Sequence, residues 1–260
     1  MKYALRGLVT PIITPLTKSY VHTMKYGDTR IKVKGDLGFL RPVHHPTPEE
    51  HFLSSLDLKG KTIYDIGSHV GILAIFFAKS TGPRGRVIAF EPNPETYTKM
   101  RKNIKLNEVD NVQILNIGIG DRRETKTLVF PRCTPAEGSM ERDIQSHITK
   151  NRMSSGLQVE VDTLDSCIAI NKLPKPDFIK IDVEGMEYTA LLGMVETIRK
   201  YKPQMHIEIH GAEKKSKIEN IQRIVGFLNS QAYTVYHVES GQTVTNNTVP
   251  TAMEGHIFCE

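Results

Sequence analysis

Asp65-Ile66-Gly67-Ser68-His69-Val70-Gly71 is the stretch that decides the fold of this chain. It follows a β-branched, apolar run at residues 62–64 and precedes an apolar helical pattern at residues 72–78. This order predicts a strand, a tight glycine turn and a helix. A second apolar run, residues 87–90, ends on Glu91 and completes a βαβ unit. Units of this kind with a glycine turn bind nucleotide-like ligands.

The same alternation of strand and helix patterns continues toward the C-terminus. Further strands are predicted at residues 112–115, 125–130, 157–161, 178–181, 205–210, 233–238 and 255–258. Helices are predicted between them, including one in which Leu191, Leu192, Val195 and Ile198 face inward. Alternation at these lengths predicts a doubly wound α/β fold with a mostly parallel, seven-stranded sheet and a closing antiparallel hairpin.

The chain divides into a short extension and one large domain. Residues 1–45 have no helical period and are expected to form an irregular N-terminal extension, with an exposed strand at residues 31–34. Residues 46–260 form the domain, which opens with a capping box at Thr47-Pro48-Glu49-Glu50. A hairpin or lid is expected as an insert around residues 121–161, and the polar residues 131–156 within it are expected to be a long mobile loop.

Composition narrows the class of protein. The net charge of +5 permits an anionic partner without requiring one. No apolar run approaches the roughly 20 residues that span a membrane, so we expect a cytoplasmic protein without a membrane span. Cys133, Cys167 and Cys259 form no CxxC pair, which argues against both a cysteine zinc site and a disulfide framework.

The glycine turn favours one cofactor over another. A dinucleotide site needs Gly-x-Gly-x-x-Gly, but the middle glycine is missing here. Asp65 would repel a pyrophosphate, whereas it suits the ammonium and sulfonium groups of S-adenosylmethionine. Glu91 is placed to accept hydrogen bonds from both ribose hydroxyls. The predicted cofactor-binding residues are Asp65, Gly67, Ser68, His69, Gly71, Glu91, Asn116, Ile117 and Asp182.

Four motifs resemble the FkbM family of S-adenosylmethionine-dependent methyltransferases. They are residues 64–71, Phe90-Glu91-Pro92, Asn116-Ile117-Gly118 and Ile179-Lys180-Ile181-Asp182-Val183-Glu184-Gly185-Met186-Glu187, and the last is the most specific. The match covers about residues 45–211. The resemblance implies a class I methyltransferase fold and transfer of a methyl group to a hydroxyl oxygen, often on a sugar or a natural product.

A hydroxyl acceptor needs a group that removes its proton. Asp182 is the first candidate for this general base, and His210 is the second. Both lie at carboxyl ends of predicted parallel strands, where sites in open α/β sheets form. A cofactor contact or a helix cap is the alternative role for Asp182. Glu184 and Glu187 are expected to complement the dipole of the following helix.

In the strand at residues 205–210, polar residues alternate with apolar ones, so the side chains of His206, Glu208 and His210 share one face. His206 and His210 are about 13 Å apart along a strand that rises roughly 3.3 Å per residue, so they cannot share one metal. Glu208 and His210, joined by Asp182, could hold a divalent metal. We favour instead a hydrogen-bonded network that orients the substrate, with Glu208 as a third candidate catalytic residue and no metal.

Three functions compete. The first is O-methylation of a small-molecule or glycosidic hydroxyl. The second is methylation of transfer RNA, which the basic Lys214, Lys215 and Lys217 would support, although basic helix faces are more often solvated than bound. The third is a non-catalytic cofactor-binding protein, because a fold does not determine a function. The sequence predicts no oligomeric state.

Overall fold

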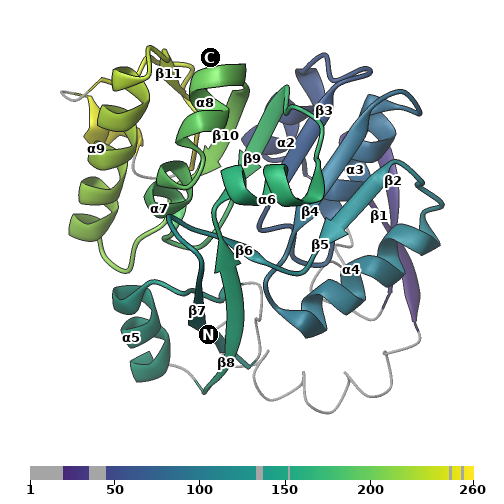
Figure 1. The fold of residues 1–260 in the computed structure, drawn as a ribbon, viewed down its shortest axis with the longest axis horizontal. Coiled ribbons are helices and arrows are strands. Elements are labelled where there is room, and N and C mark those ends of the chain that lie inside the picture. The colour runs from purple at the N-terminus through teal and green to yellow at the C-terminus, as the bar shows by residue number, and fades with distance from the viewer. Residues whose placement is uncertain (1–19, 35–44, 133–136, 152, 246–247, 253–254) are drawn as a thin grey trace.

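A computed structural model describes residues 20–34, 45–132, 137–151, 153–245, 248–252 and 255–260. Among these residues, seven strands form a sheet in the order β11-β12-β10-β9-β3-β4-β5 (Figure 1). The strands are β3 (Thr62–Ile66), β4 (Arg86–Phe90), β5 (Val112–Leu115), β9 (Phe178–Ile181), β10 (Gln204–Glu208), β11 (Val235–His237) and β12 (His256–Cys259). Within this sheet β10, β9, β3, β4 and β5 pair in parallel, and β12 is antiparallel to both of its neighbours. The predicted fold class is confirmed.

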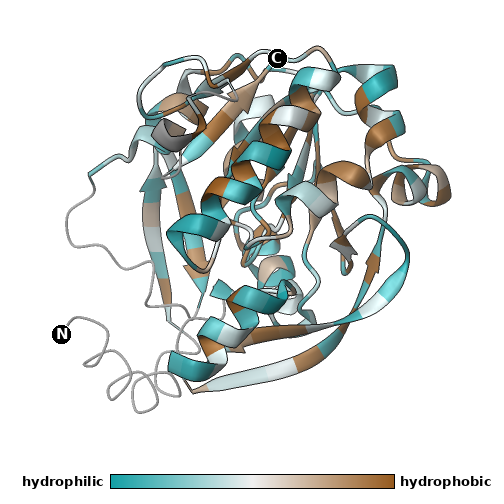
Figure 2. Cartoon of the chain, turned by 90° about the vertical axis from the view of Figure 1, so that its left-hand side faces the viewer, coloured by the Kyte–Doolittle hydropathy of each residue, from teal (hydrophilic) through white to brown (hydrophobic). Residues whose placement is uncertain are grey.

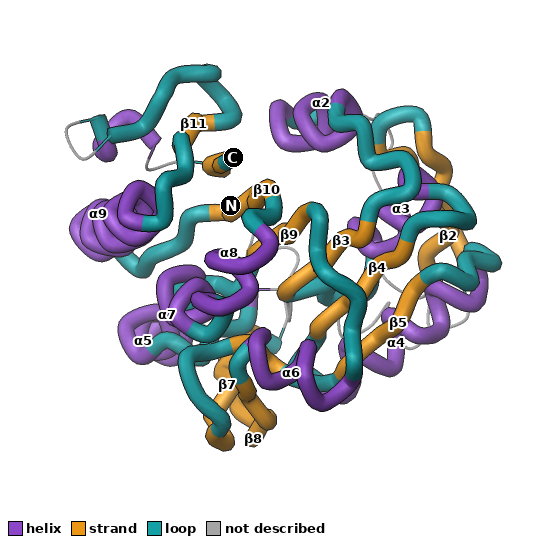
Figure 3. Tube along the Cα trace, turned by 45° about the horizontal axis from the view of Figure 1, so that its top comes forward, coloured by secondary structure: helices purple, strands orange, loops and turns teal. Residues whose placement is uncertain are grey.

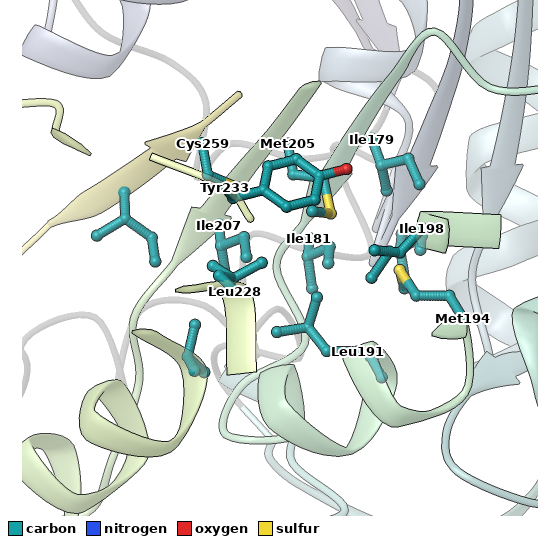
Figure 4. Packing of buried hydrophobic residues seen from close by; sticks show 14 of the residues in the cluster. Ile179, Ile181, Leu191, Met194, Ile198, Met205, Ile207, Leu228, Tyr233 and Cys259 are labelled. Atoms are coloured by element: carbon teal, nitrogen blue, oxygen red, sulfur yellow. The ribbon is translucent and has the colours of Figure 1, made fainter. Parts of the chain in front are cut away.

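Helices cover both faces of this sheet (Figure 3). One face carries α2 (Pro48–Ser55), α3 (Ile72–Thr81) and α4 (Pro94–Leu106), and the other carries α6 (Leu164–Asn171), α7 (Glu187–Leu192), α8 (Val195–Tyr201) and α9 (Lys214–Ser230). On the second face, Ile181, Ile207 and Leu228 are among the fully buried side chains that pack together (Figure 4). Because α9 is amphipathic, its hydrophobic and hydrophilic residues alternate along the ribbon in Figure 2.

None of the described helices combines the length and the apolar character needed to cross a bilayer. Of the three cysteines, Cys167 and Cys259 are buried free thiols. Cys133 lies outside the described residues. A 3₁₀ helix, η3 (Val249–Ala252), packs against α9 before the last strand.

The N-terminal extension is more regular than its sequence suggests. Strands β1 (Val21–Tyr26) and β2 (Thr29–Lys34) form an antiparallel hairpin. Ile31 and Val33 are fully buried, so the prediction of an irregular extension with an exposed strand is wrong for residues 20–34. The side chain of Asn107 in the α4 C-cap accepts a hydrogen bond from the backbone of Lys32, which ties the hairpin to the domain. The rest of the extension lies outside the described residues.

The insert contains a helix where a loop was predicted. A small sheet, β6-β8-β7, is formed by β6 (Gly118–Ile119), β7 (Glu124–Pro131) and β8 (Ser154–Asp162). Helix α5 (Arg142–Asn151) lies between β7 and β8. The Glu141 carboxylate accepts hydrogen bonds from the backbone of Asp143 and Ile144, and Ile148 is buried. These contacts stabilise a largely polar helix, so the predicted long mobile loop is wrong over that span.

The helix predicted after residue 187 is two helices. Gly193 separates α7 from α8, and a Cβ there would lie 1.8 Å from the carbonyl oxygen of Gly120. This close approach to the insert interrupts the helix. Leu192, the last residue of α7, is 37% exposed rather than facing inward as predicted.

Candidate active site

A cavity of about 270 Å³ lies at the carboxyl ends of β3, β4, β9 and β10. The glycine turn after β3 contributes Gly67 and His69 to its wall. Strand ends contribute acidic residues, which are Glu91, Asp182, Glu184 and Glu208. The insert contributes Leu128, Gly138 and Met140, so it borders the cavity.

The glycine turn can form only with glycine at its first tight position. Gly67 has a φ of +86°, which L side chains rarely adopt. A Cβ there would lie 1.7 Å from the carbonyl oxygen of Asp182. The backbone N–H of Gly67 donates to the carbonyl of Phe90 at 3.0 Å, which joins the turn to β4. The turn therefore brings β3, β4 and β9 together at the cavity floor.

Glu91 presents a buried carboxylate to the cavity. It is 7% exposed, and its oxygens accept hydrogen bonds from the backbone N–H groups of His69, at 2.9 Å, and Asn93, at 2.8 Å. Each carboxylate oxygen has a further lone pair, so the group can still accept bonds from two neighbouring hydroxyls. Burial raises the pKa of Glu91 to about 7.

Lys180 lies among carboxylates beneath the cavity. It is 2% exposed, and its Nζ lies 2.7 Å from Oδ2 of Asp182. Asp65 is its register partner in the parallel pairing of β3 with β9. Asp65 is fully buried, and neither of its carboxylate oxygens has a hydrogen-bond partner among the described residues. Burial raises the pKa of Asp65, while Lys180 lowers it. The ammonium thus compensates a buried negative charge.

His210 follows β10 and is held by Glu187, a fully buried residue at the start of α7. Nδ1 of His210 lies 2.9 Å from Oε1 of Glu187, and Asn220 donates to the other oxygen of Glu187. Nε2 faces three further carboxylate oxygens, at 3.5 Å from Glu208, 3.6 Å from Glu184 and 3.8 Å from Asp182. Burial lowers the pKa of His210, but hydrogen bonds to Glu187 and Glu208 outweigh it and raise the pKa to about 12. The ring therefore carries a proton and a positive charge.

The predicted site residues fall into two groups. Those that line the cavity are Gly67, His69, Glu91, Ile117, Asp182 and Glu208, and His210 touches this group through Glu208. Those that do not line it are Asp65, Ser68, Gly71 and Asn116. The Ser68 hydroxyl donates to the backbone of Asp65, and the Asn116 side chain donates to the carbonyl oxygens of Glu91 and Pro92. These hydrogen bonds hold the backbone next to the residues that line the cavity.

Sequence reasoning missed the contacts that organise this site. The sequence places Lys180 in a predicted buried strand, and a lysine inside such an apolar run is itself a signal of a buried ion pair. Glu187 was assigned only to the helix dipole, yet it holds His210. No local pattern shows that pairing, because the two residues meet only once α7 packs beside the end of β10.

The charges around the cavity favour a cationic ligand. Five carboxylates lie in or beneath it, those of Asp65, Glu91, Asp182, Glu184 and Glu208, against the cations Lys180 and His210. Burial, followed by Asp182 and Glu208 with an opposing contribution from His210, raises the pKa of Glu184 to about 8. An added positive charge would relieve this repulsion. S-adenosylmethionine, with its sulfonium and ammonium groups, fits that requirement.

Comparison with known proteins agrees with the site. The sequence profile of the methyltransferase FkbM domain matches residues 65–235. The hexuronic acid methyltransferase AglP of Haloferax volcanii is 25% identical over 149 residues, which are 57% of this chain and 55% of that protein. The 2-O-methyltransferase NoeI of Sinorhizobium fredii is 25% identical over 173 residues, which are 63% of this chain and 69% of that protein.

The fold also matches a solved relative. The crystal structure of methyltransferase FkbM from Methylobacillus flagellatus aligns with a TM-score of 0.50 at 17% identity, over 82% of this chain and 50% of that one. This chain spans little more than half the length of several curated relatives that it matches. The family profile nevertheless covers most of the chain, including the glycine turn and the residues after β9. As predicted, the chain belongs to the FkbM family of S-adenosylmethionine-dependent methyltransferases.

Proposed function

We propose that this protein methylates a hydroxyl oxygen on a sugar or sugar-like acceptor. The observation that carries the proposal is that Asp182 lines the same cavity as the glycine turn and Glu91. A proton acceptor and a cofactor site therefore share one space. Holding the reacting groups about 3 to 3.5 Å apart in such a space can supply much of a methyl transfer rate.

The cofactor-binding role falls to the glycine turn and to Glu91 at the end of β4. The Glu91 carboxylate would accept hydrogen bonds from the ribose hydroxyls, since its lone pairs are not exhausted by His69 and Asn93. Gly67 lets the backbone of Asp182 approach the turn closely, because a Cβ there would lie 1.7 Å from the Asp182 carbonyl oxygen. Asp65 would act through its charge from beneath the turn, because it does not line the wall.

The chemistry that the cofactor supplies is a methyl group on sulfur, whose carbon–sulfur electron pair returns to sulfur as the carbon–oxygen bond forms. Asp182 would take the proton that the acceptor hydroxyl loses. Lys180 holds Oδ2 of Asp182 at 2.7 Å, so Oδ1 is the oxygen that remains for the acceptor. Protonated His210 would position this carboxylate and that of Glu208 rather than remove a proton itself.

The acceptor class rests on the relatives. One is named for a hexuronic acid and another for a 2-O position. Both names fit a hydroxyl on a carbohydrate. The acidic cavity argues for a neutral acceptor hydroxyl beside a cationic donor, and against a polyanion entering the site itself.

The test is methyl incorporation from labelled S-adenosylmethionine into uronic acid glycosides, neutral glycosides and transfer RNA. Asp182→Asn should leave cofactor binding within about threefold of wild type and lower turnover about 10² to 10⁴-fold, the usual contribution of a general base. Glu184→Gln, which removes a carboxylate from the same wall, is the matched control and should cost less than about tenfold. Normal turnover in Asp182→Asn would contradict the role of Asp182. Labelling of RNA alone would reverse the choice of acceptor.

A further inference from the structure

We propose that Glu49, His206 and His256 form a binding site for a divalent transition metal of the zinc type. The three residues come from different elements, the start of α2, the middle of β10 and the start of β12. One ligand atom from each lies within 4.8 Å of the others. The site adjoins the active site but uses none of the residues assigned there to the cofactor.

His206 is the first observation that points to a ligand. It is fully buried, and neither of its ring nitrogens has a hydrogen-bond partner among the described residues. Its ring stacks with the rings of Phe52 and His256, whose centroids are 5.8 Å and 4.9 Å away. A buried polar group without a partner typically costs about 1–3 kcal/mol. A bound metal would use the lone pair of one ring nitrogen and remove the cost of leaving that nitrogen without a partner.

His256 is arranged as metal-ligating histidines usually are. Its Nδ1 lies 2.7 Å from Oε1 of Glu239, whose other oxygen accepts the backbone N–H of His256. A carboxylate on one ring nitrogen sets the tautomer and leaves the lone pair of the other nitrogen for a metal. Here Nε2 lies 3.6 Å from Oε1 of Glu49 and 3.7 Å from Oε2 of Glu208.

The ligand chemistry selects the metal. Two imidazoles and a carboxylate suit zinc and related transition metals better than calcium or magnesium, which prefer oxygen ligands. At bond lengths of about 2.0–2.1 Å, tetrahedral ligands lie about 3.4 Å apart, so binding would draw these side chains together by at most about 1.4 Å. Glu208 is placed to supply a fourth ligand atom.

Glu208 would connect the metal to the active site. Its Oε2 lies toward His256, while its Oε1 lies 3.5 Å from Nε2 of His210. A second cluster, which consists of Asp182, Glu208 and His210, also has the spacing of a metal site. In that cluster Nζ of Lys180 already lies 2.7 Å from Oδ2 of Asp182, and Nδ1 of His210 lies 2.9 Å from Oε1 of Glu187. The buried, unpartnered imidazole of His206 therefore favours the cluster of Glu49, His206 and His256 as the metal site.

The experiment uses the full chain, purified without a histidine tag, stripped with EDTA and titrated with Zn²⁺. Metal content measured by plasma mass spectrometry should reach about one ion per chain, and Zn²⁺ should raise the melting temperature. His206→Gln and His256→Gln should each lower Zn²⁺ affinity at least about 100-fold. Glu239→Gln, a change at a partly exposed residue, should lower it about 10 to 100-fold by releasing His256. His147→Gln on the exposed face of α5 should change nothing.

Two results would overturn the proposal. If the wild-type chain binds no Zn²⁺ at micromolar concentration and EDTA does not change its melting temperature, Glu49, His206 and His256 belong to an ion-pair network around His256. If His210→Gln abolishes Zn²⁺ binding while Glu239→Gln preserves wild-type affinity, the metal lies in the second cluster. Because Glu239→Gln leaves the buried core intact, this comparison does not depend on whether the His206 variant folds.

Discussion

Replacing Lys180 by methionine tests the charge arrangement beneath the cavity. The substitution keeps an unbranched side chain of similar length but removes the ammonium between Asp65 and Asp182. Breaking a buried ion pair typically costs about 3–5 kcal/mol. Asp182 is 27% exposed, so water screens part of its charge and we take the lower value, about 3 kcal/mol. For a chain of this size that corresponds to a fall in melting temperature of about 6–12 °C.

The pH dependence of this loss follows from Asp65. Without Lys180 the pKa of Asp65 in the folded protein rises still further above its value in the unfolded chain. The loss of stability is therefore present at pH values where the unfolded Asp65 is ionised. It vanishes at pH values where Asp65 is protonated in both states. The variant should therefore be closer to wild type at pH 5 than at pH 8. Asp65→Asn in the Lys180→Met background should recover part of the loss. Lys102→Met on the exposed face of α4 should shift the melting temperature by no more than about 2 °C. A Lys180→Met shift that small at pH 8 would refute the reasoning.

Two further predictions concern the cofactor. Because the pKa of Glu91 is about 7, calorimetry should show S-adenosylmethionine binding about tenfold more weakly at pH 6 than at pH 8, and Glu91→Gln should flatten that dependence. If the affinity of Glu91→Gln depends on pH as steeply as that of wild type, the pH dependence belongs to another group. Gly67→Ala should abolish binding, because the new Cβ would collide with the Asp182 carbonyl, whereas Gly226→Ala has open space and should bind normally. Equal affinity in the two alanine variants would contradict the geometry of the turn.

Local patterns were sufficient to predict the architecture. The apolar runs, the glycines at residues 67 and 71 and the proline-led helices each depend on neighbours within a few residues. Glu91 and Asp182 could be placed because parallel strands end at one edge of a sheet. Residue type and position along a strand were therefore enough to predict the fold class and several residues of the cavity wall.

What escaped prediction depends on contacts between distant segments. Lys180 compensates Asp65 only because β9 pairs with β3 in one register. Gly193 ends α7 only because the backbone of Gly120 passes beside it. Helix α5 has one buried side chain, Ile148, so its sequence resembles a polar loop, although Glu141 directly before it is a local cap. The partners of Lys180 and Gly193 cannot be identified from the sequence around either residue.

The most direct test of the account is a calorimetric titration of the chain with S-adenosylmethionine, repeated with Glu91→Ala and with NAD. We predict saturable binding of one S-adenosylmethionine, at least about tenfold weaker binding in the variant, and no binding of NAD, because we propose that the Glu91 carboxylate holds the ribose and that Asp65 would repel a pyrophosphate. Binding of NAD, or equal affinity for S-adenosylmethionine in wild type and Glu91→Ala, would contradict it.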